Sequence, residues 1–251
     1  MVHPLISPAA LPSPVHAIFN SPTTIGRLRS FSRGETIYEP GMAEFVGYVV
    51  SGAVKLVILS PDGRTSIVGV IEAPGLFGRV HGVTTEFAIE AASDVVLACF
   101  DRAPFEARLQ RDPDLERFVH LENLHQLDAA HERIIVLACQ SIMERMAMFL
   151  ALKLLAAPAP GGAQHADLVH IPISRRDFAA YLGTTVESVS RSIQALVRRG
   201  TIDVIDSCNF RVLRRRDLFA IARQDEQDIL EMVRSRAPRS AADSRVAIAA
   251  P

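Results

Sequence analysis

The sequence has few cysteines and no long apolar runs, and each shortage excludes a class of protein. Three cysteines in 251 residues are odd in number and widely spaced, which suits a reducing compartment. They exclude a disulfide scaffold and a four-thiolate metal site drawn from one chain. Apolar runs such as Ile134–Cys139 and Met146–Leu152 fall far short of the roughly 18 residues that span a bilayer. We therefore expect neither a membrane protein nor a secreted one. The cysteines are Cys99, Cys139 and Cys208.

The first residues also lack the pattern of an export signal. No basic stretch followed by a long apolar core stands near the N-terminus, so we expect no signal peptide and a cytoplasmic protein. Hydrophobic residues make up 49% and charged residues 22% of the chain, which is ordinary for a soluble globular protein. A length of 251 residues allows one or two domains with cores of their own.

The net charge of −1 hides an uneven distribution of charge. Between His170 and Arg223 there are ten arginines against five acids, a balance of +5, so the rest of the chain carries −6. A basic block within a nearly neutral protein is typical of a domain that binds a polyanion such as nucleic acid. A solvated basic surface without a partner is the alternative.

The N-terminal part of the chain predicts a β domain. Residues 1–14 contain four prolines and little periodicity, so they predict a flexible leader. Residues 15–111 predict an antiparallel β-roll or jelly roll, because short β-rich runs alternate there with Pro and Gly turn signals. Residues 102–110 are predicted to be helical. The clearest predicted strands are Phe45–Val50, Val54–Leu59, Ile67–Ile71 and Val95–Phe100.

A long helix is predicted from Asp112, because Asp112-Pro113 is a helix start signal and neither Gly nor Pro follows until Pro158. Spacings of three and four along it favour pairing with a second copy of itself. We assign residues 112–157 to this dimerisation helix and a following helix. Because both registers contain polar members, packing of the helix on its own β domain is the alternative. One register is His120, Leu124, Leu127, His131, Ile134 and Ala138, and the other is Asn123, Leu127, Ala130, Ile134 and Leu137.

Residues 158–225 predict a winged helix-turn-helix. Ser174 and Asp177 stand at capping-box spacing before a short helix that Gly183 ends, and Thr184 and Glu187 repeat that spacing before a second helix. Two short helices around a tight turn are typical of this DNA-binding motif. The runs Ile202–Ile205 and Phe210–Leu213 predict a two-stranded wing, and residues 226–251 a helix end and a flexible tail. On the second helix we expect a buried stripe of Val186, Val189, Ile193 and Leu196 and an opposite polar face of Glu187, Ser190, Arg191, Gln194 and Arg198.

The segment from Ser174 to Arg191 resembles the DNA-binding signature of the CRP/FNR regulators. The spacing Glu187-x-x-Ser190-Arg191 is similar to that of the FNR and FixK branch. The resemblance covers about residues 25–225. It implies an α+β chain with a cyclic-nucleotide-binding-like β-roll, a dimerisation helix and a winged helix-turn-helix. It further implies a homodimer that regulates transcription, more often as an activator, and works with RNA polymerase.

The resemblance implies that the second helix lies in the major groove and reads a TTGA-type half-site. The side chains of this helix suit base recognition. Arginine can donate to guanine, a carboxylate can accept from cytosine, and serine can bond either base. The competing readings are a helix cap for Glu187, a tolerated small residue for Ser190 and a phosphate contact for Arg191. Residues expected to touch phosphates are Arg175, Arg176, Thr184, Thr185 and Arg211.

The β-roll departs from the sensing members of this family. Arg79 stands where cyclic-nucleotide binders carry a ribose-binding glutamate, and Glu86 stands where they carry a phosphate-binding arginine. A carboxylate facing a phosphate is repulsive, so we expect no cyclic-nucleotide response; simple pairing of Arg79 with Glu86 is the bland alternative. No cysteine precedes Cys99, so no iron–sulfur cluster of the FNR kind is expected. Ser174 replaces a cysteine that some FixK-like members use, which leaves Cys208 in the wing as a redox candidate.

The histidines do not indicate a metal site. Four of them could approach a cleft beside the long helix, but the spacings of five and six residues between the last three do not put those three on one helix face. A cupin-type metalloenzyme needs two histidines two residues apart on one strand, and no such pair occurs. We therefore expect no metal, no cofactor and no enzymatic activity. The four histidines are His81, His120, His125 and His131.

Overall fold

The computed structural model describes residues 15–16, 26–41, 45–60, 63, 65–81, 85–156 and 167–234. The predicted leader 1–14, residues 157–166, and the predicted tail from residue 235 lie outside these ranges. The described residues form two compact units. One comprises the residues up to 57 and 70–126, and the other comprises 58–69 and 127–234.

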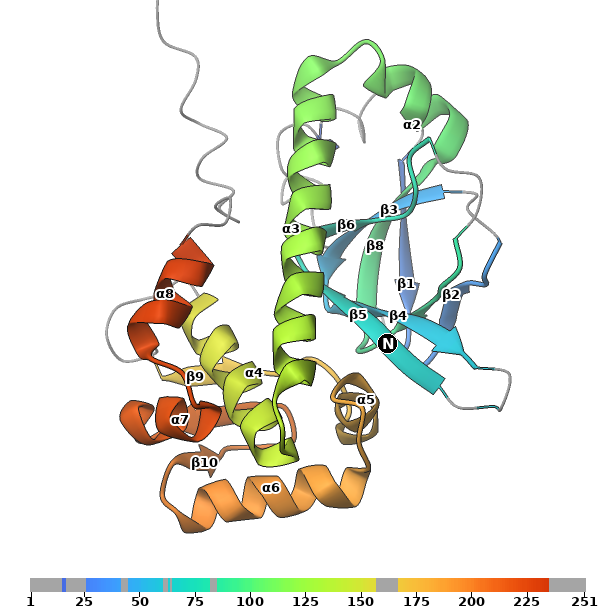
Figure 1. Ribbon diagram of the computed structural model, residues 1–251. Coiled ribbons are helices and arrows are strands. Elements are labelled where there is room, and N and C mark those ends of the chain that lie inside the picture. Colours follow the sequence, from blue (N-terminus) through green and yellow to red (C-terminus); the bar gives the residue numbers. More distant parts are fainter. Residues whose placement is uncertain are drawn as a thin grey trace, which may run out of the picture. The chain divides into compact units, whose positions relative to one another are not determined.

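Two four-stranded sheets precede the long helix in the chain (Figure 1). Four predicted strands are confirmed, whereas the four shorter ones were not predicted. The first sheet has the order β1 (Gly26–Phe31), β8 (Val95–Asp101), β3 (Phe45–Ser51) and β6 (Gly75–Phe77). The second has the order β2 (Thr36–Tyr38), β7 (Ala88–Ala91), β4 (Ala53–Leu59) and β5 (Thr65–Glu72). The recorded pairings β1–β8, β3–β8, β3–β6, β2–β7 and β4–β7 are antiparallel, as expected for a β-roll.

Aromatic side chains fill the space inside this roll. The rings of Tyr38, Phe45 and Phe77 lie with centroids 5.4, 6.0 and 6.2 Å apart. A Cβ at Gly47, on β3, would collide with the ring of Phe77, so a larger residue there would have to displace that ring. A second cluster joins the first sheet to helix α2 (Arg102–Leu109) through residues such as Phe100 and Phe105.

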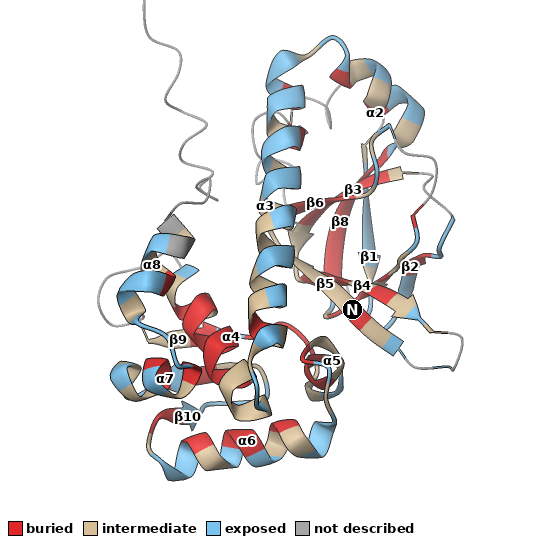
Figure 2. Ribbon diagram, in the orientation of Figure 1, coloured by how far each residue is buried: buried red, intermediate tan, exposed pale blue. Residues whose placement is uncertain are grey.

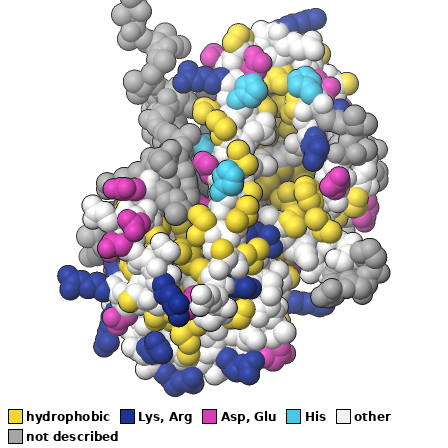
Figure 3. All heavy atoms as spheres, viewed as in Figure 1, with side chains coloured by type: hydrophobic (Ala, Val, Ile, Leu, Met, Phe, Trp, Pro, Cys, Tyr) yellow, Lys and Arg dark blue, Asp and Glu magenta, His cyan; other side chains and the backbone are white. Residues whose placement is uncertain are grey.

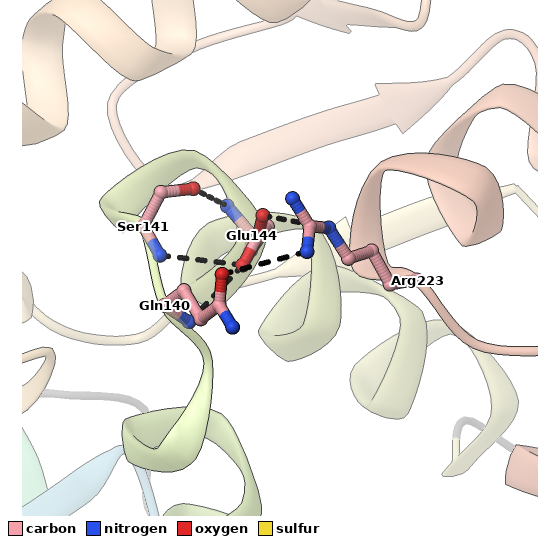
Figure 4. A network of polar contacts seen from close by, with 4 residues as sticks. All are labelled: Gln140, Ser141, Glu144 and Arg223. Carbon is pink, nitrogen blue, oxygen red and sulfur yellow. Dashed lines mark hydrogen bonds and ion pairs between the residues drawn. The ribbon is translucent and has the colours of Figure 1, made fainter.

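The long helix is present as predicted. Helix α3 (Pro113–Ala138) has 26 residues, and the Asp112 carboxylate accepts a 3.2 Å hydrogen bond from the N–H of Leu115 at its start. Helix α4 (Ile142–Ala156) follows after a three-residue break. Glu144 and Ser141 form a capping box at this break: the N–H of Glu144 donates to the Ser141 hydroxyl, and the Glu144 carboxylate accepts from the N–H groups of Gln140 and Ser141 (Figure 4).

The C-terminal unit is built around α4, of which eight residues are buried, and Figure 2 shows this helix largely in red. The helices are α5 (Arg175–Tyr181), α6 (Val186–Arg198), α7 (Arg215–Ala222) and α8 (Glu226–Arg234). The predicted wing is confirmed as β10 (Ile202–Val204) and β11 (Asn209–Val212). A third strand, β9 (Leu168–His170), pairs antiparallel with β11 and was not predicted.

Candidate nucleic-acid interface

Each helix of the α5–α6 pair begins at a side-chain cap. The Ser174 hydroxyl accepts from the N–H of Asp177 at 3.0 Å and donates to the Asp177 carboxylate at 2.8 Å, which confirms Ser174 as the predicted cap and its pairing with Asp177. The second capping prediction is wrong by one residue: Thr185, not Thr184, caps α6 and accepts from the N–H of Ser188. The turn between the helices passes through Gly183, whose φ of +64° lies in the left-handed region that favours glycine.

Helix α6 has one buried face and one exposed face, as Figure 2 shows. Val189, Ile193 and Leu196 are buried as predicted, and Ser192 joins them by donating its hydroxyl to the carbonyl of Ser188. The prediction that Val186 belongs to the buried stripe is wrong, because this residue is 36% exposed. Val186 is the first residue of α6, and about a third of its surface faces solvent. Its side chain is therefore available on the outer surface of α6.

The three predicted base-reading residues lie together on α6. Glu187 and Arg191 are exposed, and Ser190 is partly exposed. The pKa of Glu187 is lowered, first because its carboxylate accepts from its own backbone N–H, and further by the Thr185 hydroxyl and the charge of Arg191. The guanidinium of Arg191 donates to the Ser188 hydroxyl at 3.3 Å. The outer surface of α6 thus presents a carboxylate, a hydroxyl and a guanidinium in the first turns of the helix.

The predicted phosphate contacts fall into two groups. Arg176, Thr185 and Arg211 are exposed, and Thr184 is partly exposed. Arg175 differs, because it is half-buried with its guanidinium 5.3 Å from the ring centroid of Phe210 on β11, and burial lowers its pKa. Arg175 therefore ties the start of α5 to the wing. Figure 3 shows further Lys and Arg side chains gathered over α6 and α7.

The wing turn is organised by Asp206. Its carboxylate accepts hydrogen bonds from the N–H groups of Cys208 and Asn209, at 2.7 and 2.9 Å, and from the side-chain amide of Asn209 at 2.7 Å. The pKa of Asp206 is lowered, first by that amide and then by the Cys208 N–H. Cys208 is partly exposed, and Arg175 is the cation that interacts with it electrostatically.

Most of the predicted dimer seam lies on the surface of α3. Leu124 and Leu127 are each 51% exposed and Ile134 is 63% exposed, and Ala130 is exposed as well. Leu137 is partly buried and contacts the region of Gly183. An apolar row of this kind on one long helix is left uncovered within a single chain.

Two β-roll residues stand at the positions where cyclic-nucleotide binders are expected to carry their ligand-binding residues, and both are exposed. Neither Arg79 nor Glu86 is buried, and no ion pair joins them in the described part of the chain. Arg79 instead lies close enough to Tyr38 to oppose, by its charge, the burial that raises the pKa of that phenol to about 12.

The histidines predicted not to form a metal site lie apart or pair with carboxylates. His120 lies 3.8 Å from Glu116, and the ring of His125 lies 3.4 Å from Glu122. Within the described ranges, no group of three or more His, Cys, Asp or Glu side chains is placed to hold a metal ion. Among the same residues, none of the helices combines the length and apolarity that crossing a bilayer requires.

A winged helix-turn-helix with an exposed polar face, preceded by a β-roll and a long helix, defines a DNA-binding regulator. Comparison with known families agrees with this class. Residues 28–112 match the cyclic nucleotide-binding domain, and residues 144–221 match the Crp-like helix-turn-helix domain.

Individual relatives narrow the assignment. The chain is 33% identical to the transcriptional activator protein FnrL of Cereibacter sphaeroides over 69% of this chain and 71% of that protein. It is 34% identical to the nitrogen fixation regulation protein FixK of Bradyrhizobium diazoefficiens, over 72% and 76% of the two chains. The solved structure of FixK2 from Bradyrhizobium japonicum superposes with a TM-score of 0.68 at 28% identity, covering 78% of this chain and 97% of that one. The chain belongs to the CRP/FNR family of transcription regulators, in its FixK-like branch.

Proposed function

We propose that this chain is a homodimeric transcription activator that reads a TTGA-type palindrome, and that it has no enzymatic activity. The observation that carries the proposal is the outer face of α6, where Glu187 and Arg191 are exposed and Ser190 is partly exposed, on a helix anchored by its opposite face. In this assignment residues 158–225 bind DNA, residues 112–157 hold the dimer, and residues 15–111 form the sensor-like domain.

Each reading side chain has a base that suits its chemistry. Arg191 would bond guanine through O6 and N7, Glu187 would accept from the amino group of cytosine, and Ser190 would serve either. Val186 adds an apolar contact that the sequence did not predict, because an exposed side chain beside Glu187 suits the methyl group of thymine. Replacing the half-site thymines with deoxyuridine, which lacks that methyl, should weaken binding by the wild type more than by Val186→Ala.

The surrounding side chains would hold the backbone of the DNA. Arg176, Thr184, Thr185 and Arg211 surround the reading residues along α5, α6 and the wing, where phosphate contacts position a helix without reading sequence. Arg175 is the weaker candidate, because its guanidinium already packs on Phe210. Its contribution would be to hold the wing in place.

The exposed row on α3 supports a homodimer. Leu124, Leu127 and Ile134 would become buried between two copies of the helix, which removes an apolar surface from water. A two-fold dimer would place its reading helices about 34 Å apart, one turn of DNA. A palindrome is the site that such symmetry requires.

Activation implies a contact with RNA polymerase, and the name of the FnrL relative supports the role of activator. Transcription in a purified system, with a promoter that carries the palindrome and with a scrambled control, tests this step. An increase that depends on the palindrome supports activation, whereas a decrease would make the protein a repressor.

Fluorescence anisotropy with labelled duplexes tests the DNA-binding proposal directly. At one fixed salt concentration the palindrome should bind about 10³-fold or more tightly than a scrambled duplex of equal length and composition. Equal affinity for the two duplexes would leave only charge-driven binding and would refute sequence recognition.

A further inference from the structure

A single arginine joins the corner between α3 and α4 to the turn of the helix-turn-helix. The Nε of Arg145, in the first turns of α4, donates to the carbonyl oxygen of Cys139 at 3.2 Å. A terminal nitrogen of the same guanidinium donates to the carbonyl oxygen of Leu182 at 3.1 Å. Cys139 directly follows α3, and Leu182 is the C-cap of α5.

Both acceptors are carbonyls at helix C-termini. The last carbonyls of a helix have no partner within it, and the helix dipole makes that end negative. A guanidinium suits this position, because it is cationic and its fork presents several N–H groups at fixed angles. Arg145 therefore bonds two helix ends at once, and the rigid fork fixes the distance between them.

Packing around the guanidinium brings the same two helices together. A Cβ built on Gly183 would lie 3.8 Å from both Arg145 and the Leu137 side chain of α3. One turn earlier on α3, the guanidinium of Arg133 lies 5.2 Å from the ring centroid of Tyr181, the last residue of α5. Two side chains near the C-terminal end of α3, Arg133 and Leu137, thus lie beside the end of α5 and its turn, together with Arg145 of α4.

The reading helix starts directly after this point. Only three residues separate Leu182 from Val186, and within them the N–H of Thr184 bonds the carbonyl of Ala179 at 3.0 Å. Whatever fixes Leu182 relative to α3 therefore fixes the start of α6 relative to the exposed seam on α3.

We propose that Arg145 is a positioning residue that sets the half-site spacing the dimer accepts, by holding the α5–α6 turn against the end of the dimerisation helix. The inference rests on the proposed function, since spacing has meaning only for a dimer on a palindrome. Arg145 does not contact DNA in this role. Its removal should leave recognition of one half-site intact and change only how the two half-sites must be placed.

The experiment measures binding of the full-length protein to three palindromes, whose TTGA half-sites have centres 9, 10 or 11 base pairs apart. The wild type should prefer the 10-base-pair spacing about tenfold or more, because a spacing error costs contacts in one half-site. For Arg145→Ala the three affinities should converge to within about threefold. A duplex with a single half-site should bind both proteins equally.

Arg145→Lys gives a second, milder variant. A lysine keeps the charge and the stem but offers one ammonium in place of a fork, so it cannot bridge both carbonyls with the same geometry. It should lose the spacing preference as well, and it decides the question if Arg145→Ala does not fold.

Arg223→Ala is the matched control at the same corner. The Nε of Arg223, at the end of α7, lies 3.0 Å from the Glu144 carboxylate, and its guanidinium approaches Gln140 (Figure 4). This ion pair touches the α3–α4 break but no part of α5, so its loss should leave the spacing preference unchanged.

The outcomes separate the inference from the function it rests on. A folded Arg145→Lys or Arg145→Ala dimer that keeps the wild-type spacing preference overturns the positioning role. An equal loss of affinity on all four duplexes also overturns it, because Arg145 would then support DNA binding in general. A wild type that binds palindromes and scrambled DNA alike would instead refute the proposed function.

Discussion

The carboxylate of Glu122, on α3, accepts a 3.1 Å hydrogen bond from the backbone N–H of Leu76, in the middle of strand β6. Gln126, one helical turn further on, donates its amide to the carbonyl oxygen of the same residue. Strand β6 ends its sheet, and Leu76 is only 2% exposed. Side chains of α3 therefore satisfy the peptide groups of an edge strand that has no further strand to pair with.

Removing the Glu122 carboxylate should destabilise the N-terminal unit. Glu122→Ala leaves the buried Leu76 N–H without a partner, and we expect a loss of about 1–3 kcal/mol in the free energy of unfolding. Urea unfolding followed by circular dichroism measures it. Glu122→Gln keeps an acceptor oxygen and should lose less. If both variants lost the same free energy of unfolding, the effect would come from the negative charge of the carboxylate, which also faces His125.

Periodicity was sufficient to predict the longer elements of this fold. The strands of seven or eight residues and the 26-residue helix α3 have patterns long enough to repeat. Strand β6 has only three residues, all buried, and its partners β3 and α3 are distant in sequence. Its position depends on contacts such as Glu122 with Leu76, which no local pattern encodes. Strand β1 was not predicted either. Four of its six residues are exposed, so few of its positions show the pattern of a buried strand.

The exposed polar face of α6 was predicted from the sequence, but its edge was not. The burial of Val189 and the exposure of Glu187 and Arg191 follow from helical spacing. The exposure of Val186 does not, because spacing cannot show where the core ends beneath the first turn. Likewise two adjacent threonines precede α6, and only the backbone geometry selects Thr185 as the cap.

Arg191→Ala should weaken binding to the palindrome by about 1–3 kcal/mol, because a bidentate contact to guanine is lost. Binding to a scrambled duplex should change far less. Fluorescence anisotropy on both duplexes at one salt concentration measures the difference.

Arg211→Ala is the comparison, because Arg211 is exposed on the wing strand β11 and is assigned to phosphate. It should weaken binding to both duplexes alike and reduce the slope of log affinity against log salt by about 1. If Arg191→Ala gave the same uniform loss, Arg191 would also be a phosphate contact and base reading would fall to Glu187 and Ser190.

Ile134→Glu should convert the dimer to a monomer. Ile134 belongs to both registers of the seam and is 63% exposed in the single chain, so the variant should fold normally. Two carboxylates would then be buried without partners at the dimer contact, which is strongly unfavourable. Sedimentation velocity measures the result, with Leu121→Glu as the control, since Leu121 is on α3 but in neither register. A persistent dimer would place the interface elsewhere.

Two further variants distinguish the registers. Leu124 belongs to the first register only, and Ala130 belongs to the second only. If Leu124→Glu dissociates the dimer and Ala130→Glu does not, the first register holds. The opposite result assigns the second.

The β-roll should respond neither to cyclic nucleotides nor to oxygen through a cluster. Glu86 would repel the phosphate, and the rings of Tyr38, Phe45 and Phe77 occupy the interior of the roll. The purified protein should be colourless and should bind its palindrome in air without added ligand. Heat on titration with micromolar cyclic AMP would refute the first part, and visible absorbance from iron would refute the second.

Cys99 is buried, whereas Cys139 and Cys208 are both partly exposed. Burial raises the pKa of Cys99 to about 11, and burial also raises the pKa of Cys139. Both thiols therefore ionise less readily to the reactive thiolate. Cys208 is partly exposed in the wing turn, next to the positive charge of Arg175. Peroxide should reach Cys208 before the buried Cys99, because the Cys208 side chain is partly exposed.

Oxidation of Cys208 should weaken DNA binding without regard to sequence. A sulfinic acid adds a negative charge, and in the docked dimer the wing would lie against the phosphate backbone, which positions the domain but carries no base information. The palindrome and a scrambled duplex should therefore lose affinity in parallel as peroxide is titrated, and Cys208→Ser should be resistant. An equal loss in wild type and Cys208→Ser would assign the sensitivity to another group, and no loss in either would make Cys208 incidental. A loss confined to the palindrome would mean that the wing influences the reading helix, through the contact between Arg175 and Phe210 that joins β11 to the start of α5.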